Sequence, residues 1–134
     1  MAVSPAQRRY NWRVVFLAIV YAAVLMPVCW LFAQHRVSGP IAYAFGILPA
    51  LPVSGFFVAI GLYLSEETDE YLRMLLIRQS LVATGFAMTA ATFWGFLEGF
   101  DLVPHVVGYA WPIVWFAGLG LGTCVNIAIE RRAA

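Results

Sequence analysis

The residues best suited to chemistry form one charged segment in the middle of the chain. Four carboxylates stand within five residues and two arginines follow them: Glu66, Glu67, Asp69, Glu70, Arg73 and Arg78. Carboxylates at this density attract and orient a positively charged protein electrostatically. The segment therefore predicts a docking surface for a basic partner, with these six residues as its candidate contacts.

The same segment is also typical of a solvated helix start. Thr68 suits an N-cap, and Asp69 and Glu70 in the first turn complement the positive end of the helix dipole. Arg73 follows them at i+4 and i+3, where weak local ion pairs form. A helix from here to Leu97 would be about 43 Å long, which exceeds a bilayer core, so its first turns should stand outside the membrane. Both interpretations remain open.

A second set of polar residues lies next to the ends of the apolar segments. It consists of His35, Glu98, Asp101 and His105. Two imidazoles and two carboxylates could bind zinc, and a histidine could respond to pH. Such residues also simply end apolar helices in water, and their spacing fixes no geometry. We expect no metal site and no cofactor.

The chain carries no motif of an enzyme. It has no paired nucleophile and base, no phosphate-binding loop and no ionisable residue inside its apolar segments. Buried carboxylates usually mark proton-coupled carriers, and small multidrug transporters depend on one in their first helix. We therefore predict a non-catalytic protein.

The composition places these polar residues on a membrane protein. Of 134 residues, 63% are hydrophobic and 11% are charged, against about 25% charged in a soluble domain. The charges leave four long gaps, each with room for about 20 residues of membrane-spanning helix. They predict an all-α, polytopic up-down bundle of four transmembrane helices in a single domain, 1–134, with spans at 14–32, 41–64, 79–97 and 106–129.

The arginines predict the orientation. In a four-span bundle Arg36 stands alone on one side, and the other seven of the eight basic residues lie on the opposite side. Short loops rich in arginine stay cytoplasmic. The sequence thus predicts cytoplasmic termini in a multi-pass protein of the bacterial inner membrane.

Small residues and prolines within the spans suggest how the helices pack. Gly118 and Gly122 form a G-x-x-x-G pair, which permits close helix approach either within the bundle or in an oligomer. Pro49 and Pro52 interrupt the second span, where they predict static kinks or, alternatively, a moving hinge. Cys29 and Cys124 lie at opposite depths and should stay unpaired.

The segment Asp69-Glu70-Tyr71-Leu72-Arg73 before a long apolar helix, closed by Trp94-Gly95-Phe96-Leu97-Glu98, resembles a group of small uncharacterised four-helix inner-membrane proteins of proteobacteria. The resemblance covers about residues 66–98. Some members are encoded beside helix-turn-helix regulators. The resemblance thus implies a membrane protein that sequesters or tunes a DNA-binding protein, without contacting nucleic acid itself.

Together these features predict an integral inner-membrane protein that acts through protein–protein contacts and tethers or regulates a basic cytoplasmic partner. The alternative is a subunit or assembly factor of a larger membrane complex, a homo- or hetero-oligomer joined through the glycine face of the fourth span. A small oligomeric channel or transporter is the third alternative.

Overall fold

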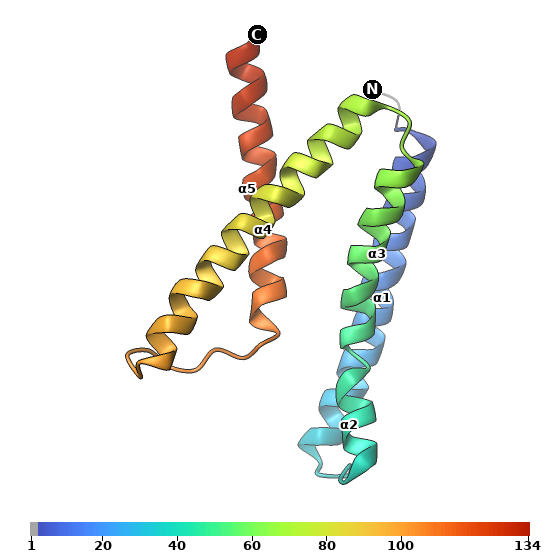
Figure 1. The fold of residues 1–134 in the computed structure, drawn as a ribbon. Coiled ribbons are helices and arrows are strands. Elements are labelled where there is room, and N and C mark those ends of the chain that lie inside the picture. The colour runs from blue at the N-terminus through green and yellow to red at the C-terminus, as the bar shows by residue number, and fades with distance from the viewer. Residues whose placement is uncertain (1–2) are drawn as a thin grey trace. The chain divides into compact units, whose positions relative to one another are not determined.

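The computed structural model describes residues 3–134, and all regular structure in that range is helical. The helices are α1 (Pro5–Ala33), α2 (Pro40–Ile47), α3 (Ala50–Glu66), α4 (Glu70–Gly99) and α5 (Ala110–Ala133), drawn in Figure 1. Four stretches are long and apolar enough to cross a membrane: α1, α2 with α3, α4, and α5. The prediction of an all-helical chain with four such helices is confirmed.

The chain divides into two compact units between Thr68 and Asp69. In the first unit α1 packs antiparallel to α3, with α2 between them in the chain, and we call this unit the first hairpin. In the second unit α4 packs against α5, and we call it the second hairpin. Each hairpin is described by itself below.

Helix α1 begins at Pro5, nine residues before the predicted span. Proline at the first helical position loses no hydrogen bond, because that N–H would have no intrahelical partner. The Ser4 hydroxyl accepts a hydrogen bond from the Gln7 N–H at 3.0 Å and caps the helix. The Ser-Pro pair therefore sets the start of α1, and the charged residues that follow it belong to the same helix.

The span predicted at 41–64 is interrupted at its prolines, where α2 ends at Ile47 and α3 begins at Ala50. Pro49 has no N–H to donate to the Phe45 carbonyl, and Pro52 has none for Leu48. Across the break the Leu51 N–H donates to the Leu48 carbonyl at 3.3 Å, which is a tighter turn than an α-helix makes. Two prolines three residues apart thus divide the span.

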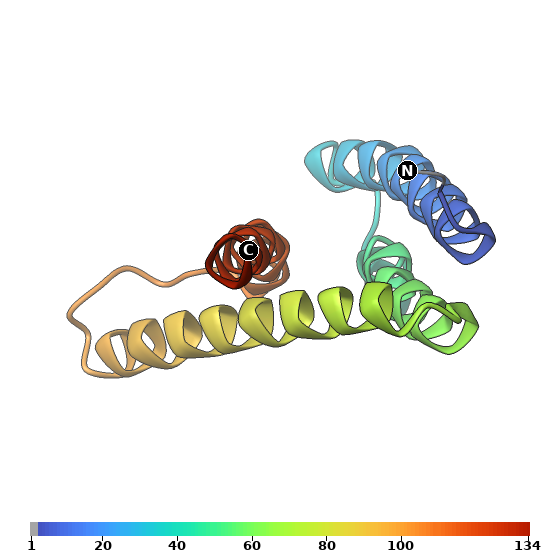
Figure 2. The ribbon, with the colours of Figure 1, turned by 90° about the horizontal axis from the view of Figure 1, so that it is seen from above.

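The second hairpin is packed through small residues. A Cβ placed on Gly118 would lie 2.8 Å from the Ala83 Cα, and one on Gly122 would lie 2.7 Å from the Gln79 Cα. Both glycines and Ala83 are buried. In Figures 1 and 2 the red helix α5 crosses close against α4. Only glycine permits this approach, so the G-x-x-x-G pair joins α5 to α4 within the chain.

Polar side chains on the same seam link the two helices. Asn126, which is buried, donates from Nδ2 to the Leu75 carbonyl at 3.0 Å and accepts from Arg78 at 3.3 Å. One turn further along α4, Gln79 donates from Nε2 to Thr123 Oγ1 at 2.8 Å. Such interhelical hydrogen bonds stabilise membrane helices by about 0.6 to 1.7 kcal/mol each.

Most large apolar side chains on both hairpins point outward. Of the residues in the most apolar stretch of each helix, between 6% and 22% are buried within the protein. A soluble protein rarely exposes apolar patches of this extent, whereas hydrocarbon chains of lipid cover them without cost. The exposed surface of the hairpins is thus suited to a bilayer.

Candidate interaction surfaces at the arginine-rich helix ends

Glu66, one of the predicted partner contacts, is bound within the first hairpin. Its Oε1 accepts from Arg13 Nη2 at 2.8 Å, and its Oε2 accepts from Arg13 Nη1 at 3.2 Å and from Arg9 Nε at 3.0 Å. Arg9 and Arg13 are one turn apart on α1, so both reach the same carboxylate at the end of α3. Two-point binding of this kind fixes orientation as well as distance. Glu66 therefore joins the two helices.

This environment lowers the pKa of Glu66, which lies beyond the predicted span at 41–64. Hydrogen bonds from Arg13 and then Arg9 to the charged form bring the pKa from 4.5 to about 2. Because the pKa is lower in the folded protein, the ion pair stabilises the hairpin above pH 4.5, and this contribution is lost as the pH falls toward 2.

We expect the end of the first hairpin that carries Glu66 to stay closed at pH 4 and to open as the pH falls from about 4 to 2. Spin labels on Asn11→Cys and Ser65→Cys, in a variant lacking Cys29 and Cys124, would report the distance between the helices. The Glu66→Gln variant is the control and should show no change over this range. Opening already complete at pH 4 would contradict the prediction.

Glu67 is also engaged within the first hairpin. It is 4% exposed, and its Oε2 accepts a hydrogen bond of 2.5 Å from the Ser4 hydroxyl. The same hydroxyl caps α1, so the carboxylate lies at the positive end of the α1 dipole. Tyr10 and Tyr63 stack just inside this contact, with ring centroids 5.2 Å apart. Glu66 and Glu67 thus have a structural use that the sequence reading did not assign.

Asp69, not Thr68 as predicted, is the N-cap of α4. Its Oδ1 accepts from the N–H of Tyr71 at 2.9 Å and from that of Leu72 at 3.4 Å. Within residues 3–134 Arg73 forms no ion pair with Glu70, and its backbone N–H donates to the Asp69 carbonyl at 3.0 Å. Aspartate caps at least as well as threonine, which explains the one-residue shift.

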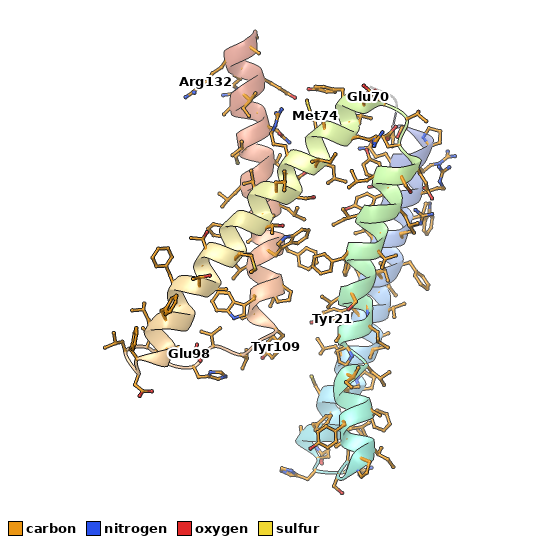
Figure 3. The ribbon with its side chains drawn as sticks, viewed as in Figure 1. Tyr21, Glu70, Met74, Glu98, Tyr109 and Arg132 are labelled. Atoms are coloured by element: carbon orange, nitrogen blue, oxygen red, sulfur yellow. The ribbon has the colours of Figure 1, made fainter. Side chains whose placement is uncertain are left out.

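Glu70 and Arg73 are exposed on the first turn of α4, and in the part of the chain that the structure describes neither side chain forms an ion pair. Figure 3 shows Glu70 at the start of α4 and Arg132 near the end of α5. On α5 the neighbouring Glu130 accepts a hydrogen bond from the Tyr71 hydroxyl. The end of the second hairpin where α4 begins and α5 ends therefore presents Glu70 with the arginines Arg73, Arg131 and Arg132.

Arg78 lies one turn deeper and belongs to the interhelical seam. It donates from Nη1 to Asn126 Oδ1 at 3.3 Å and from Nη2 to the sulfur of Met74 at 3.6 Å. A guanidinium has five N–H donors, so donors remain for lipid headgroups. Its position favours a structural contribution over a contact with a soluble partner.

The opposite end of the second hairpin brings together two of the four residues considered for zinc. Glu98 and Nδ1 of His105 lie within hydrogen-bond distance across the connecting loop, and the Trp94 Nε1 donates to the Pro104 carbonyl at 3.2 Å. Asp101 takes a positive φ of 58° in the same loop. His35 lies in the first hairpin. Between residues 3 and 134 no three histidine, cysteine or acidic side chains gather closely enough to hold a metal ion.

Comparison of the chain with protein-family models, curated proteins and solved structures finds no match. The site must therefore be interpreted from its own geometry.

One signal in the sequence could have distinguished the carboxylates bound within the first hairpin, Glu66 and Glu67, from the exposed Glu70. Arg9 and Arg13 are spaced at i and i+4, directly after a Ser-Pro helix start, and face the chain segment that returns at Glu66. Antiparallel neighbours of equal length bring these residues to one level. The basic flank of α1 thus indicated an internal partner for the first acidic residues.

Proposed function

We propose that the chain is a non-catalytic, multi-pass protein of the bacterial inner membrane that tethers or regulates a cytoplasmic protein. The observation that carries the proposal is that the acidic residues differ in whether they are bound within the protein. Glu66 and Glu67 hold the first hairpin, whereas Glu70 is exposed and without an ion pair. An exposed, unpaired charge beside a membrane is free to steer a partner.

The proposed contact surface is accordingly smaller than the six residues predicted from sequence. It consists of Glu70, flanked by Arg73. The candidate partner is a basic protein such as a helix-turn-helix regulator, as the resemblance to the proteobacterial four-helix proteins implies. Arg73 would pair with an acidic residue on that partner and so set its register.

Affinity capture from native bacterial membranes tests this proposal. Recovery of a cytoplasmic protein with the wild type should fall about tenfold with Glu70→Lys, because reversing one close charge pair costs more than 1.4 kcal/mol of binding free energy. Asp69→Asn keeps the cap and removes only the charge, so it should cause a smaller loss. Asp101→Asn, on the loop at the opposite end of the hairpin, is the matched control. Equal recovery with all variants at low salt would refute the proposal.

The alternative is a subunit or assembly factor of a larger membrane complex. The predicted glycine face is not free for this role, because Gly118 and Gly122 contact α4. Gly120, by contrast, has open space at its Cβ position and faces away from that seam. A complex joined side to side would use this face, and Gly120→Leu should then reduce the particle size on a native gel.

A further inference from the structure

Both sides of the first hairpin carry a proline that removes a helical hydrogen bond, Pro27 within the continuous helix α1 and Pro49 between α2 and α3, and the two prolines lie at one level. A Cβ on Gly55 would contact Leu17 at 2.8 Å, and one on Gly46 would contact the ring of Phe32 at 3.9 Å. Interpolation between these two contacts places Pro49 opposite the turn of α1 that ends at Pro27, to within about one helical turn. The missing helical hydrogen bonds on the two sides of the hairpin therefore lie at the same level.

At this level both backbones lack a helical hydrogen bond. Pro27 cannot donate to the Ala23 carbonyl, and Pro49 cannot donate to that of Phe45. The 3.3 Å bond from Leu51 to Leu48 is the tie across the break. A helix with all its hydrogen bonds would stiffen a broken neighbour, whereas here the facing turn of α1 lacks one hydrogen bond as well.

The two ends of the hairpin are fastened very differently. The end that carries the start of α1 and the end of α3 is held by the Ser4–Glu67 hydrogen bond, the Glu66 ion pairs and the packed rings of Tyr10 and Tyr63. Beyond the prolines, no hydrogen bond or ion pair joins α1 to α2 among the described residues, and Trp30 and Ile47 are 51% and 59% exposed. One end is therefore fixed and the other is held by apolar contact alone.

From this asymmetry we infer that the first hairpin has a hinge at Pro27 and Pro49, about which its outer segment, residues 28–48, bends as one piece. The ten residues from Pro40 to Pro49 make an arm of about 14 Å, so a bend of about 20° moves its tip by about 5 Å. The inference goes beyond the proposed function and does not depend on any cytoplasmic partner.

Hydrogen–deuterium exchange of the full chain in lipid nanodiscs tests the hinge. In the wild type the amides of residues 45–51 should exchange faster than those of 56–62. Pro49→Ala should slow the 45–51 segment. The decisive variant is Pro27→Ala, which alters no bond of that segment but supplies α1 with the missing N–H for the Ala23 carbonyl. It should slow exchange at 45–51 by about threefold to tenfold, the effect of one added helical hydrogen bond.

Pro112→Ala in the second hairpin is the matched control and should leave the exchange of 45–51 unchanged. If Pro27→Ala also leaves it unchanged while Pro49→Ala slows it, the two interruptions act independently and the hinge is refuted. Equal slowing by Pro27→Ala and Pro112→Ala would refute it as well, because the effect would not come from the level shared by Pro27 and Pro49.

Discussion

Gly122→Leu is expected to force α4 and α5 apart and to lower the free energy of unfolding of the second hairpin by about 3 kcal/mol, the upper end of the cost of overpacking. A Cβ at this position would lie 2.7 Å from both the Cα and the carbonyl oxygen of Gln79. These are backbone atoms of a helix and cannot rotate away. The leucine side chain therefore fits only if the helices separate, which also breaks the hydrogen bonds of Gln79 to Leu119 and Thr123.

Gly120→Leu is the matched control, because it adds the same side chain to the same helix at a position with open space. Unfolding by titration with SDS in mixed micelles should give nearly the wild-type free energy for Gly120→Leu and a much lower one for Gly122→Leu. Equal stability of the two variants would mean that α5 does not pack on α4 through its glycine seam.

Glu66→Arg is expected to separate α1 from α3 at the end of the first hairpin that carries Arg9, Arg13 and Glu66. The substitution removes the acceptor of three hydrogen bonds from Arg9 and Arg13 and places a third positive charge beside them. Three like charges at this distance repel one another. Spin labels on Asn11→Cys and Ser65→Cys should report a longer and broader distance distribution than in the wild type.

Exchanging the charges of Glu66 and the two arginines distinguishes electrostatic repulsion from a steric effect of the larger side chain. Combining Glu66→Arg with Arg9→Glu and Arg13→Glu restores opposite charges at the same positions, so most of the wild-type distribution should return. Arg8→Glu is the control, because Arg8 is exposed and forms no ion pair within residues 3–134. If the triple variant remains as open as Glu66→Arg, the ion pair does not close the hairpin.

The four apolar helices could be predicted from the sequence because the signal is a long run without charge, and length alone decides it. The bounds were less accurate where charged residues belong to a helix. Arg9 and Arg13 were placed outside the first span, yet the Ser4 cap starts α1 before them. A hydropathy pattern reports the apolar part of a helix, whereas capping residues determine where it begins.

The roles of the acidic residues could not be predicted, because they depend on which helix lies opposite. Glu66, Glu67, Asp69 and Glu70 are close in sequence but have four different environments: an ion pair, a buried hydrogen bond, a helix cap and open solvent. Sequence proximity suggested one acidic surface. The break at Pro49 was visible as a proline, but its alignment with Pro27 required the register of the hairpin.

The account depends on the arginine-rich ends of both hairpins facing the cytoplasm, and thiol labelling of intact bacterial cells tests this most directly. In a chain with Cys29→Ala and Cys124→Ala, single cysteines are introduced as Ser38→Cys, between α1 and α2, or as Ala134→Cys, at the end of α5. A membrane-impermeant maleimide should label Ser38→Cys in intact cells and Ala134→Cys only after permeabilisation. Labelling of Ala134→Cys in intact cells, with Ser38→Cys protected, would contradict the account.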